Sequence, residues 1–209
     1  MLQALPTDEG IMMAARCSAE AVTQAIKKLG VQAQVSVASV NGPNSIVAAG
    51  AEAEVLMVMS ELGQEGTRLS VSHAFHSPLM MPMADEFRAV VTWLSESGAL
   101  LSSADPPIPV VSTVTGSVAS AEELADPEHW VRQVWSPVLF SGALEAALDQ
   151  WSSGEASKPC VVVEVGPNPV LSRMARPWVG AGRVAAWCAS LDRQSKLDDV
   201  GGIEQAATT

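Results

Sequence analysis

The three histidines are the side chains with the widest chemical scope in this chain of 209 residues. The chain has no tyrosine, so the set of groups available for acid–base work is narrow. His73 and His76 lie three residues apart in a segment that ends at Ser77 and Pro78. An imidazole in such a segment titrates near neutral pH and could act as a general base. The spacing equally fits a polar surface loop, and the residues alone leave both interpretations open.

A metal site is not expected from the remaining residues of this kind. Cys17, Cys160 and Cys188 lie far apart and form none of the Cys-x-x-Cys or Cys/His spacings that bind zinc. His129 is remote from the other two histidines, and no acidic residue near it has the spacing of a metal ligand. We therefore expect free thiols in a reducing compartment, with no metal and no bound cofactor.

The sequence also lacks the usual signals of two common site types. It contains no G-x-S-x-G, the motif that places a nucleophilic serine on a sharp turn after a strand. A histidine base therefore has no such serine to activate within these residues. Gly166 is followed by proline and asparagine and does not begin a G-x-G-x-x-G pattern, which argues against a dinucleotide loop.

The composition is that of a globular protein with an acidic balance. Hydrophobic residues make up 48% of the chain, and 12 basic against 23 acidic residues give a formal net charge of −11. A nucleic-acid or anionic-membrane surface needs the opposite sign, so neither partner is expected. The longest apolar runs, such as 161–165, are far shorter than the ~20 residues that span a bilayer. We expect a soluble, cytoplasmic protein.

Residues 10–71 are predicted to form a small α/β unit. Apolar alternation between turn residues indicates strands at 11–15, 34–40, 45–49 and 68–71. Helical periodicity indicates helices at 19–29 and 51–62, the first capped by Ser18 and ended by Gly30. The order β-α-β-β-α-β is the split arrangement of ferredoxin-like domains, so we expect a ferredoxin-like small subdomain here.

Residues 72–191 are predicted to alternate helices and strands, which indicates a layered α/β sheet. The expected helices cover 80–97, 125–134, 140–151 and 170–176, and the expected strands cover 110–114, 160–165 and 184–189. The run at 160–165 is continuously apolar, as in a strand buried on both faces. Residues 192–209 have weak periodicity and are expected to form a linker or disordered tail.

Four segments, in this order, resemble the acyltransferase domains of polyketide and fatty-acid synthases, the malonyl-CoA:acyl carrier protein transacylase family. They read VNGPNSIVAAG at 40–50, HAFHSPLM at 73–80, WVRQVWSPV at 130–138 and VEVGPNPVL at 163–171. The resemblance covers residues 1 to about 191, and ASLDR at 189–193 resembles the linker after such domains in multidomain synthases.

The resemblance implies an α/β-hydrolase-like acyltransferase domain into which the ferredoxin-like subdomain is inserted. Residues 1–9 then form the end of a helix of the large subdomain, and residues 72–191 form its C-terminal part. The family transfers malonyl from malonyl-CoA, through an acyl-serine, to the phosphopantetheine thiol of an acyl carrier protein. The partners implied are therefore the carrier protein and the missing N-terminal part or other synthase domains.

The motifs also imply roles for particular residues. His76 matches the general base, and Gln133 matches the residue whose backbone carbonyl orients that imidazole. The residues before His76, namely His73, Ala74 and Phe75, match the segment associated with the choice of extender unit, and the HAFH form goes with malonyl.

Two asparagines of the turn at 41–44, Asn41 and Asn44, are expected to line the site as well.

The chain departs from the family at its N-terminal side. The family's serine lies further before the histidine than the 75 residues that precede His76. We therefore expect the serine, the malonate-binding arginine and the oxyanion glutamine to lie outside these residues, and the chain alone to be inactive. The alternative is a non-catalytic interaction module that docks a carrier protein or a synthase partner. Arg173, Arg176 and Arg183 are the clustered cations that an anionic partner would meet.

Overall fold

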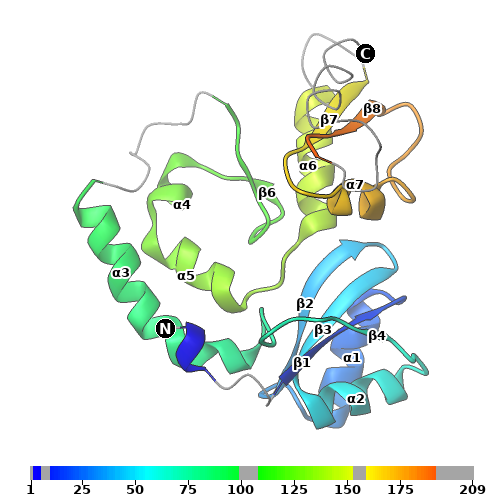
Figure 1. Cartoon of the computed structure of the whole chain (residues 1–209), viewed down its shortest axis with the longest axis vertical. Coiled ribbons are helices and arrows are strands. Elements are labelled where there is room, and N and C mark those ends of the chain that lie inside the picture. The colour runs from blue at the N-terminus through cyan, green and yellow to red at the C-terminus, as the bar shows by residue number, and fades with distance from the viewer. Residues whose placement is uncertain (1, 6–9, 99–107, 153–158, 192–209) are drawn as a thin grey trace. The chain divides into compact units, whose positions relative to one another are not determined.

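The computed structural model describes residues 2–5, 10–98, 108–152 and 159–191 (Figure 1). Two compact units make up the chain, Met1–Leu144 and Glu145–Thr209. The helix α6 (Phe140–Ser152) runs across the boundary between them. The expected tail at 192–209 and most of the expected N-terminal helix end lie outside the described residues. Of that N-terminal segment, Leu2–Ala4 is described and forms a short 3-10 helix.

A four-stranded antiparallel sheet forms the centre of the first unit. Its strands are β1 (Gly10–Ala15), β2 (Val35–Gly42), β3 (Ser45–Ala51) and β4 (Thr67–Arg68), in the spatial order β2-β3-β1-β4. Two helices connect them, α1 (Ala19–Leu29) after β1 and α2 (Glu52–Glu61) after β3. The elements therefore follow one another as β-α-β-β-α-β, close to the ranges predicted from the periodicity.

One face of this sheet packs against both helices, because the helices present apolar stripes to it. Ser18 accepts the Ala21 N–H at 3.2 Å and so begins α1, and Gly30 ends it with φ +72°. The core between sheet and helices consists of buried aliphatic side chains and methionines: Ile11, Met13, Ala15, Val22, Ala25, Ile26, Val31, Val35, Val37, Ile46, Ala48, Val55, Val58 and Met59.

The opposite face of the sheet packs against the segment that follows β4. Met12, Ala38, Val47 and Ala49 form a second buried cluster with Ala74, and Leu69, Phe75 and Leu79 pack against it. Sheet residues alternate between the two clusters because successive strand side chains point to opposite faces. The compact unit therefore extends through residues 72–144, whereas the sequence indicated a boundary near residue 71.

The edge strand β2 pairs with a further segment far along the chain. Val138 donates its N–H to the Ala38 carbonyl at 2.8 Å, and Val40 donates to the Val138 carbonyl at 2.9 Å. Ser39 and Val138 form a parallel bridge. An edge strand leaves a row of unpaired N–H and C=O groups, and Val138 satisfies part of that row.

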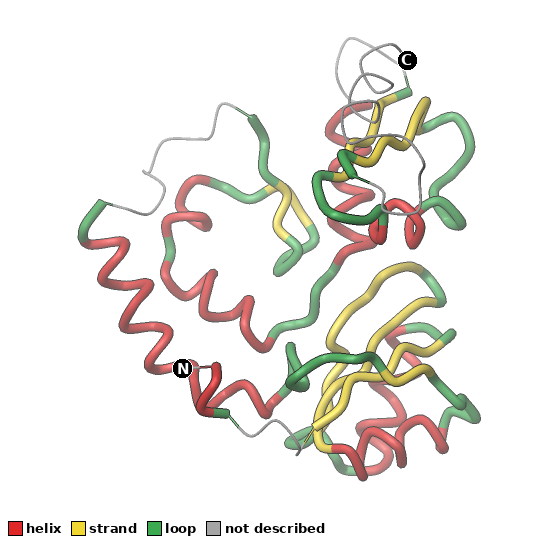
Figure 2. The backbone as a smooth tube through the Cα atoms, in the orientation of Figure 1, coloured by secondary structure: helices red, strands yellow, loops and turns green. Residues whose placement is uncertain are grey.

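The rest of the first unit is mainly helical, as Figure 2 shows. A 3-10 helix (η2, Pro78–Met83) leads into α3 (Ala84–Glu96). The hairpin of β5 (Val111–Ser112) and β6 (Ser117–Val118) comes next, followed by α4 (Ala121–Ala125) and α5 (Pro127–Trp135).

Three of the expected ranges in this part were wrong in extent, and two of the differences have a clear physical cause. The helix expected at 80–97 begins as 3-10 helix because Pro82 has no N–H for an α-helical turn. The helix expected at 125–134 begins only at Pro127, since Asp126 precedes this proline and is extended, with φ −74° and ψ 117°. A separate helix, α4, ends at Ala125. The strand expected at 110–114 is reduced to Val111–Ser112.

The second unit contains a pair of parallel strands, β7 (Cys160–Glu164) and β8 (Val184–Ala189), with the short helix α7 (Val170–Ala175) between them. The expectation that β7 is buried on both faces is wrong, because Val161 and Val163 are 41% and 53% exposed. β7 has one neighbouring strand among the described residues, so only part of its apolar surface is covered.

The carboxylate of Glu164 begins α7. It accepts the Leu171 N–H at 2.9 Å and the Ser172 N–H at 2.8 Å, so the Gly-Pro-Asn-Pro turn returns the chain to the end of β7. Burial alone would raise the pKa of Glu164. The amide hydrogen bonds outweigh it and hold the pKa below its ordinary value.

The backbones of β2 and β3 approach each other closely at Gly50. It has φ +150°, and a Cβ there would lie 2.0 Å from the Gln34 carbonyl oxygen and 2.8 Å from the Val35 Cα. Backbone atoms cannot rotate away, so Gly50→Ala should lower the free energy of unfolding by about 3–5 kcal/mol. Gly63→Ala is the control, because Gly63 also has positive φ but open space around it, and should cost only about 1 kcal/mol. Equal losses in urea unfolding would contradict this account of Gly50.

Glu164→Gln tests the cap of α7. The variant should lose about 1 kcal/mol of stability at pH 7 in urea unfolding, because an amide offers one acceptor oxygen to two N–H groups. Because the pKa of Glu164 is lowered in the folded chain, its carboxylate stabilises the fold fully at pH values above the ordinary pKa of glutamate. This stabilisation is lost as the pH falls through the lower pKa of the folded chain. The difference between the two proteins should therefore shrink below about pH 4. Glu65→Gln, at an exposed carboxylate, is the control; a pH-independent difference for Glu164→Gln would contradict the cap.

Candidate functional site

His76 lies in a backbone conformation that sets it apart in the described chain. With φ +58°, it is the one described residue other than glycine at positive φ. The residues on either side hold the chain in this conformation. The buried Ser77 donates its hydroxyl to the Ala74 carbonyl at 2.6 Å and accepts the Leu79 N–H at 3.3 Å, which begins η2. Residues in such sparsely populated conformations concentrate at functional sites.

The imidazole of His76 contacts a backbone carbonyl. Its Nδ1 lies 3.0 Å from the carbonyl oxygen of Ser136. A carbonyl only accepts hydrogen bonds, so Nδ1 carries the proton in the neutral ring, and Nε2 is left with a lone pair. A general base needs a ring nitrogen with a free lone pair, and in this tautomer Nε2 is that nitrogen.

The surroundings of the ring favour its neutral form. Burial lowers the pKa of His76, and the carbonyls of Ser136 and Gln133 offset only part of that effect. The net pKa is below the ordinary value of histidine, so the ring is uncharged and able to accept a proton at neutral pH.

The carbonyl of Ser136 is available because of the residues around it. Asp126 accepts the Glu128 N–H at 2.9 Å and begins α5, which ends at Trp135. Ser136 precedes Pro137 and so leaves the helical conformation, with ψ 152°. Val138 then joins the edge of β2, which fixes the chain two residues beyond the carbonyl.

The resemblance pointed to Gln133 as the residue that orients His76. The structure shows the Nδ1 contact with Ser136, three residues further on, while the Gln133 carbonyl is the second backbone group that raises the pKa of the ring. Sequence reasoning missed Ser136. The available signal was its position between a predicted helix end and a proline, where a free carbonyl is expected.

The three residues expected to govern substrate choice lie directly before His76, but they differ in exposure. His73 is buried, with Nδ1 3.0 Å from the Ser72 hydroxyl and Nε2 3.3 Å from the Leu5 carbonyl. Ala74 is buried in the second cluster beneath the sheet. The Phe75 ring is half-buried against that cluster, 5.9 Å from the His73 ring centre. Phe75 therefore retains the most accessible surface of the three.

The two expected asparagines have different surroundings. Asn41 is half-buried near the end of β2, where its Oδ1 accepts the hydroxyl of Ser39, the residue that bridges Val138. Asn44 is exposed in the turn between β2 and β3. Neither is hydrogen-bonded to His76 in the described part of the chain.

The third histidine, His129, lies between a serine and a glutamate, which are residue types that also occur in catalytic triads. His129 has Nε2 3.4 Å from the Ser112 hydroxyl and Nδ1 3.1 Å from a carboxylate oxygen of Glu123. Ser112 and His129 are 6% and 3% exposed, and the Ser112 hydroxyl also accepts the Val114 N–H at 3.1 Å. A substrate cannot reach this serine. The 3.1 Å contact between Glu123 and His129 lacks hydrogen-bond geometry, so these three residues do not form a working triad.

Two of the three clustered arginines, Arg176 and Arg183, bind groups of the second unit itself. Arg183 pairs with Glu145 and, at 2.6 Å, with Asp149. Arg176 donates to the Trp187 carbonyl at 3.1 Å. The charge of Arg183 is therefore compensated by two carboxylates of α6, which weakens the cluster as a surface for anionic partners.

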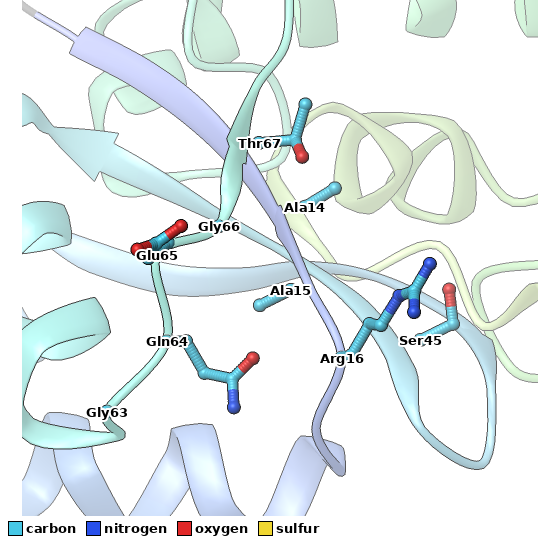
Figure 3. Close-up of a pocket in the computed structure, with 9 residues that line it drawn as sticks. All are labelled: Ala14, Ala15, Arg16, Ser45, Gly63, Gln64, Glu65, Gly66 and Thr67. Carbon is cyan, nitrogen blue, oxygen red and sulfur yellow. The ribbon is translucent and has the colours of Figure 1, made fainter.

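A hollow of about 570 Å³ lies at another place in the first unit (Figure 3). Arg16, Ser45, Gln64 and Thr67 contribute polar groups to it. These residues lie near Ala15, which pairs with Ile46 at one end of the sheet. Ser36, which contacts the backbone of His76, pairs with Ala49 towards the other end, so the hollow is separate from the histidine site.

Metal and membrane features are absent from the part of the chain that the structure describes. No group of three or more His, Cys, Asp or Glu side chains is placed to bind a metal ion there. Among the described helices, none has the length and apolar character needed to cross a bilayer.

Comparison with known proteins agrees with this architecture. The acyl transferase domain model matches residues 7–194, and the chain therefore belongs to the acyl transferase domain family. It is 41% identical over 192 residues to the polyketide synthase GfsA of Streptomyces halstedii, covering 89% of this chain and 2% of that protein.

Solved structures show the same fold. The acyltransferase domain from the second module of the salinomycin polyketide synthase matches with a TM-score of 0.80 and 32% identity, over 98% of this chain and 44% of that one. A malonyl-transacylase in complex with a type II polyketide synthase acyl-carrier protein matches with a TM-score of 0.73 and 25% identity, over 97% and 60%. This chain thus spans only a part of the domains it resembles.

The lowered pKa of His76 can be measured directly. In the folded chain its ring should titrate below the ordinary value of about 6.5, followed by the ring proton shifts in NMR spectra. The same histidine in the urea-unfolded chain is the matched control and should titrate at the ordinary value. Between the two values the unfolded chain binds more protons, so His76 lowers folding stability as pH falls through this window. A folded midpoint at or above the unfolded one would contradict the neutral-base arrangement.

Proposed function

We propose that this chain is the C-terminal part of a malonyl-type acyltransferase domain in which His76 is the general base. The full domain transfers malonyl from malonyl-CoA to the phosphopantetheine thiol of an acyl carrier protein, in polyketide or fatty-acid synthesis. The nucleophilic serine is supplied by sequence outside these 209 residues, which contain no G-x-S-x-G. No cofactor takes part, because the thioester already carries the activated acyl group.

The observation that carries the proposal is the contact between the His76 ring and the Ser136 carbonyl. The 3.0 Å contact at Nδ1 leaves Nε2 free as the proton acceptor, and the lowered pKa keeps it unprotonated. In hydrolase triads a carboxylate does this orienting work. A neutral carbonyl orients the ring without adding a charge that would raise its pKa strongly.

The chemistry then follows in two balanced half-reactions. Nε2 of His76 takes the serine hydroxyl proton as the oxygen attacks the malonyl thioester carbon. The imidazolium returns that proton to the sulfur of coenzyme A as the carbon–sulfur bond breaks, leaving malonyl-serine. In the second half-reaction the phosphopantetheine thiol gives its proton to Nε2, attacks the ester, and the serine oxygen recovers the proton.

The side chain of Phe75 supports malonyl as the acyl group. It lies directly before the base and retains accessible surface, so a bulky ring there occupies space that an α-methyl substituent would need. The buried residues His73 and Ala74 precede Phe75 and hold its segment in place. A single methyl group is worth only about 1–3 kcal/mol, so we propose a partial preference. Asn41 and Asn44 line the approach.

The subdomain assignment forms part of the same proposal. The β-α-β-β-α-β arrangement of residues 10–71 is the ferredoxin-like small subdomain, and residues 72–191 belong to the large, α/β-hydrolase-like subdomain together with 1–9. The carrier protein is the proposed partner, supported by the related malonyl-transacylase that was solved with an acyl-carrier protein.

Acyl transfer from radiolabelled malonyl-CoA tests the function. The chain alone should acquire no stable label. Label should appear when the N-terminal part of a related acyltransferase domain, carrying G-x-S-x-G, is co-expressed with it. His76→Ala should then reduce the labelling rate by about 10²–10⁴-fold, the usual contribution of a general base. Thr23→Ala, at an exposed position of α1, is the control and should label like the unchanged chain.

Three results would contradict the proposal in different ways. Stoichiometric labelling of the chain alone would point to another nucleophile. A folded complex that does not label would favour a non-catalytic interaction module. Labelling that His76→Ala leaves unchanged would remove His76 from the role of base.

A further inference from the structure

The main chain of His76 is held by a residue that neither the motifs nor the resemblance single out. The Ser36 hydroxyl donates to the His76 carbonyl at 2.7 Å, across 40 positions of sequence. Ser36 lies in β2, half-buried, with its Cα opposite Ala49 of β3. The hydroxyl is therefore presented by a strand whose position the sheet determines.

His76 needs such a hold because its conformation is intrinsically unfavourable. At φ +58° a residue with a Cβ is crowded, and it persists there only when its surroundings over-determine the backbone. The bonds of Ser77 to Ala74 and Leu79 fix the chain on one side. They do not fix the rotation of the peptide unit that follows the His76 Cα, and the Ser36 hydroxyl binds that peptide unit through its oxygen.

The same strand also locates the carbonyl that the ring contacts. Ala38 and Val40 of β2 bind Val138, two residues after Ser136. The short stretch of β2 from Ser36 to Val40 therefore positions both ends of the histidine. It binds the His76 carbonyl directly, and it positions the partner of Nδ1 through Val138. The distance from Nδ1 to the Ser136 oxygen depends on both anchors.

We propose that Ser36 is a positioning residue, which holds the His76 main chain so that the ring meets the Ser136 carbonyl and presents Nε2. The expected effect of Ser36 on acyl transfer rests on the proposed function. The alignment itself is a property of the folded chain. Loss of the hydroxyl lets the peptide unit rotate, weakens the Nδ1 contact and releases the ring to the other neutral tautomer.

A matched pair of variants tests the role of the hydroxyl. Ser36→Thr keeps the hydroxyl and adds one methyl group, whereas Ser36→Val carries two methyl groups and no hydroxyl. The two variants therefore have nearly the same shape and differ in the hydroxyl, and both side chains suit a strand. Long-range proton–nitrogen NMR spectra of the ¹⁵N-labelled full chain report the tautomer of His76. The ratio of the Nε2–H to the Nδ1–H form should rise by about threefold to tenfold in Ser36→Val, the factor that one hydrogen bond supplies. It should stay unchanged in Ser36→Thr.

Controls separate positioning from general damage to the fold. Thr23→Ala also removes a hydroxyl–carbonyl bond, of 2.8 Å in α1, and should leave the tautomer ratio unchanged. Should valine disturb folding, Ser36→Cys offers a weaker donor of similar size and should shift the ratio in the same direction. An unchanged ratio in Ser36→Val, or in Ser36→Cys where that variant is needed, overturns the proposal.

The labelling assay distinguishes failure of this proposal from failure of the proposed function. In the reconstituted domain, Ser36→Val should slow labelling about threefold to tenfold while the final amount of label is unchanged. Ser36→Thr should restore the rate. No labelling in any variant, together with the expected tautomer shift, would overturn the function and leave the positioning role standing. Normal labelling by a Ser36→Val chain with an unshifted tautomer would overturn the positioning role alone.

Discussion

The pairing of β2 with Val138 is the interaction on which the candidate site depends. It joins two segments separated by about a hundred residues through the hydrogen bonds of Val138 to Ala38 and Val40. It also brings the end of α5 beside the His76 segment, which packs on the open face of the same sheet. Because β2 is an edge strand, this pairing uses backbone groups that would otherwise remain unsatisfied. The sheet therefore positions both the His76 segment and the chain around Ser136.

The electrostatics of the site follow from the kind of partner that this pairing supplies. A carbonyl orients the ring and selects one tautomer, but it stabilises the protonated form less than a carboxylate does. Burial then outweighs it, and the pKa of His76 falls. The carboxylate of Glu123 lies instead beside His129, whose buried position is closed to substrate. Position in the fold, rather than residue type, separates a candidate base from a structural histidine.

The segments that resemble the acyltransferase family each have a local structural task here. Gly50 ends the hairpin motif where a Cβ would meet the backbone of Gln34, and Glu164 caps the helix that follows its own strand. In the segment 130–138, Pro137 ends the helical conformation at Ser136, whose carbonyl contacts the His76 ring. These local roles agree with membership of the acyl transferase domain family, whose model matches residues 7–194.

The sequence by itself determined the helices and strands of residues 10–71 and the resemblance to the family. Caps such as Ser18, the glycine at 30 and the alternation in β2 and β3 act over a few residues, so pattern reasoning located them. It also singled out His76 through its motif. Only the tertiary structure decided which carbonyl meets the ring, that His76 takes positive φ, and that Ser36 holds it. Prolines at 82, 127 and 137 modify helices locally, but the partners of Ser36 and Val138 lie 40 and about 100 positions away, a separation that no periodicity records.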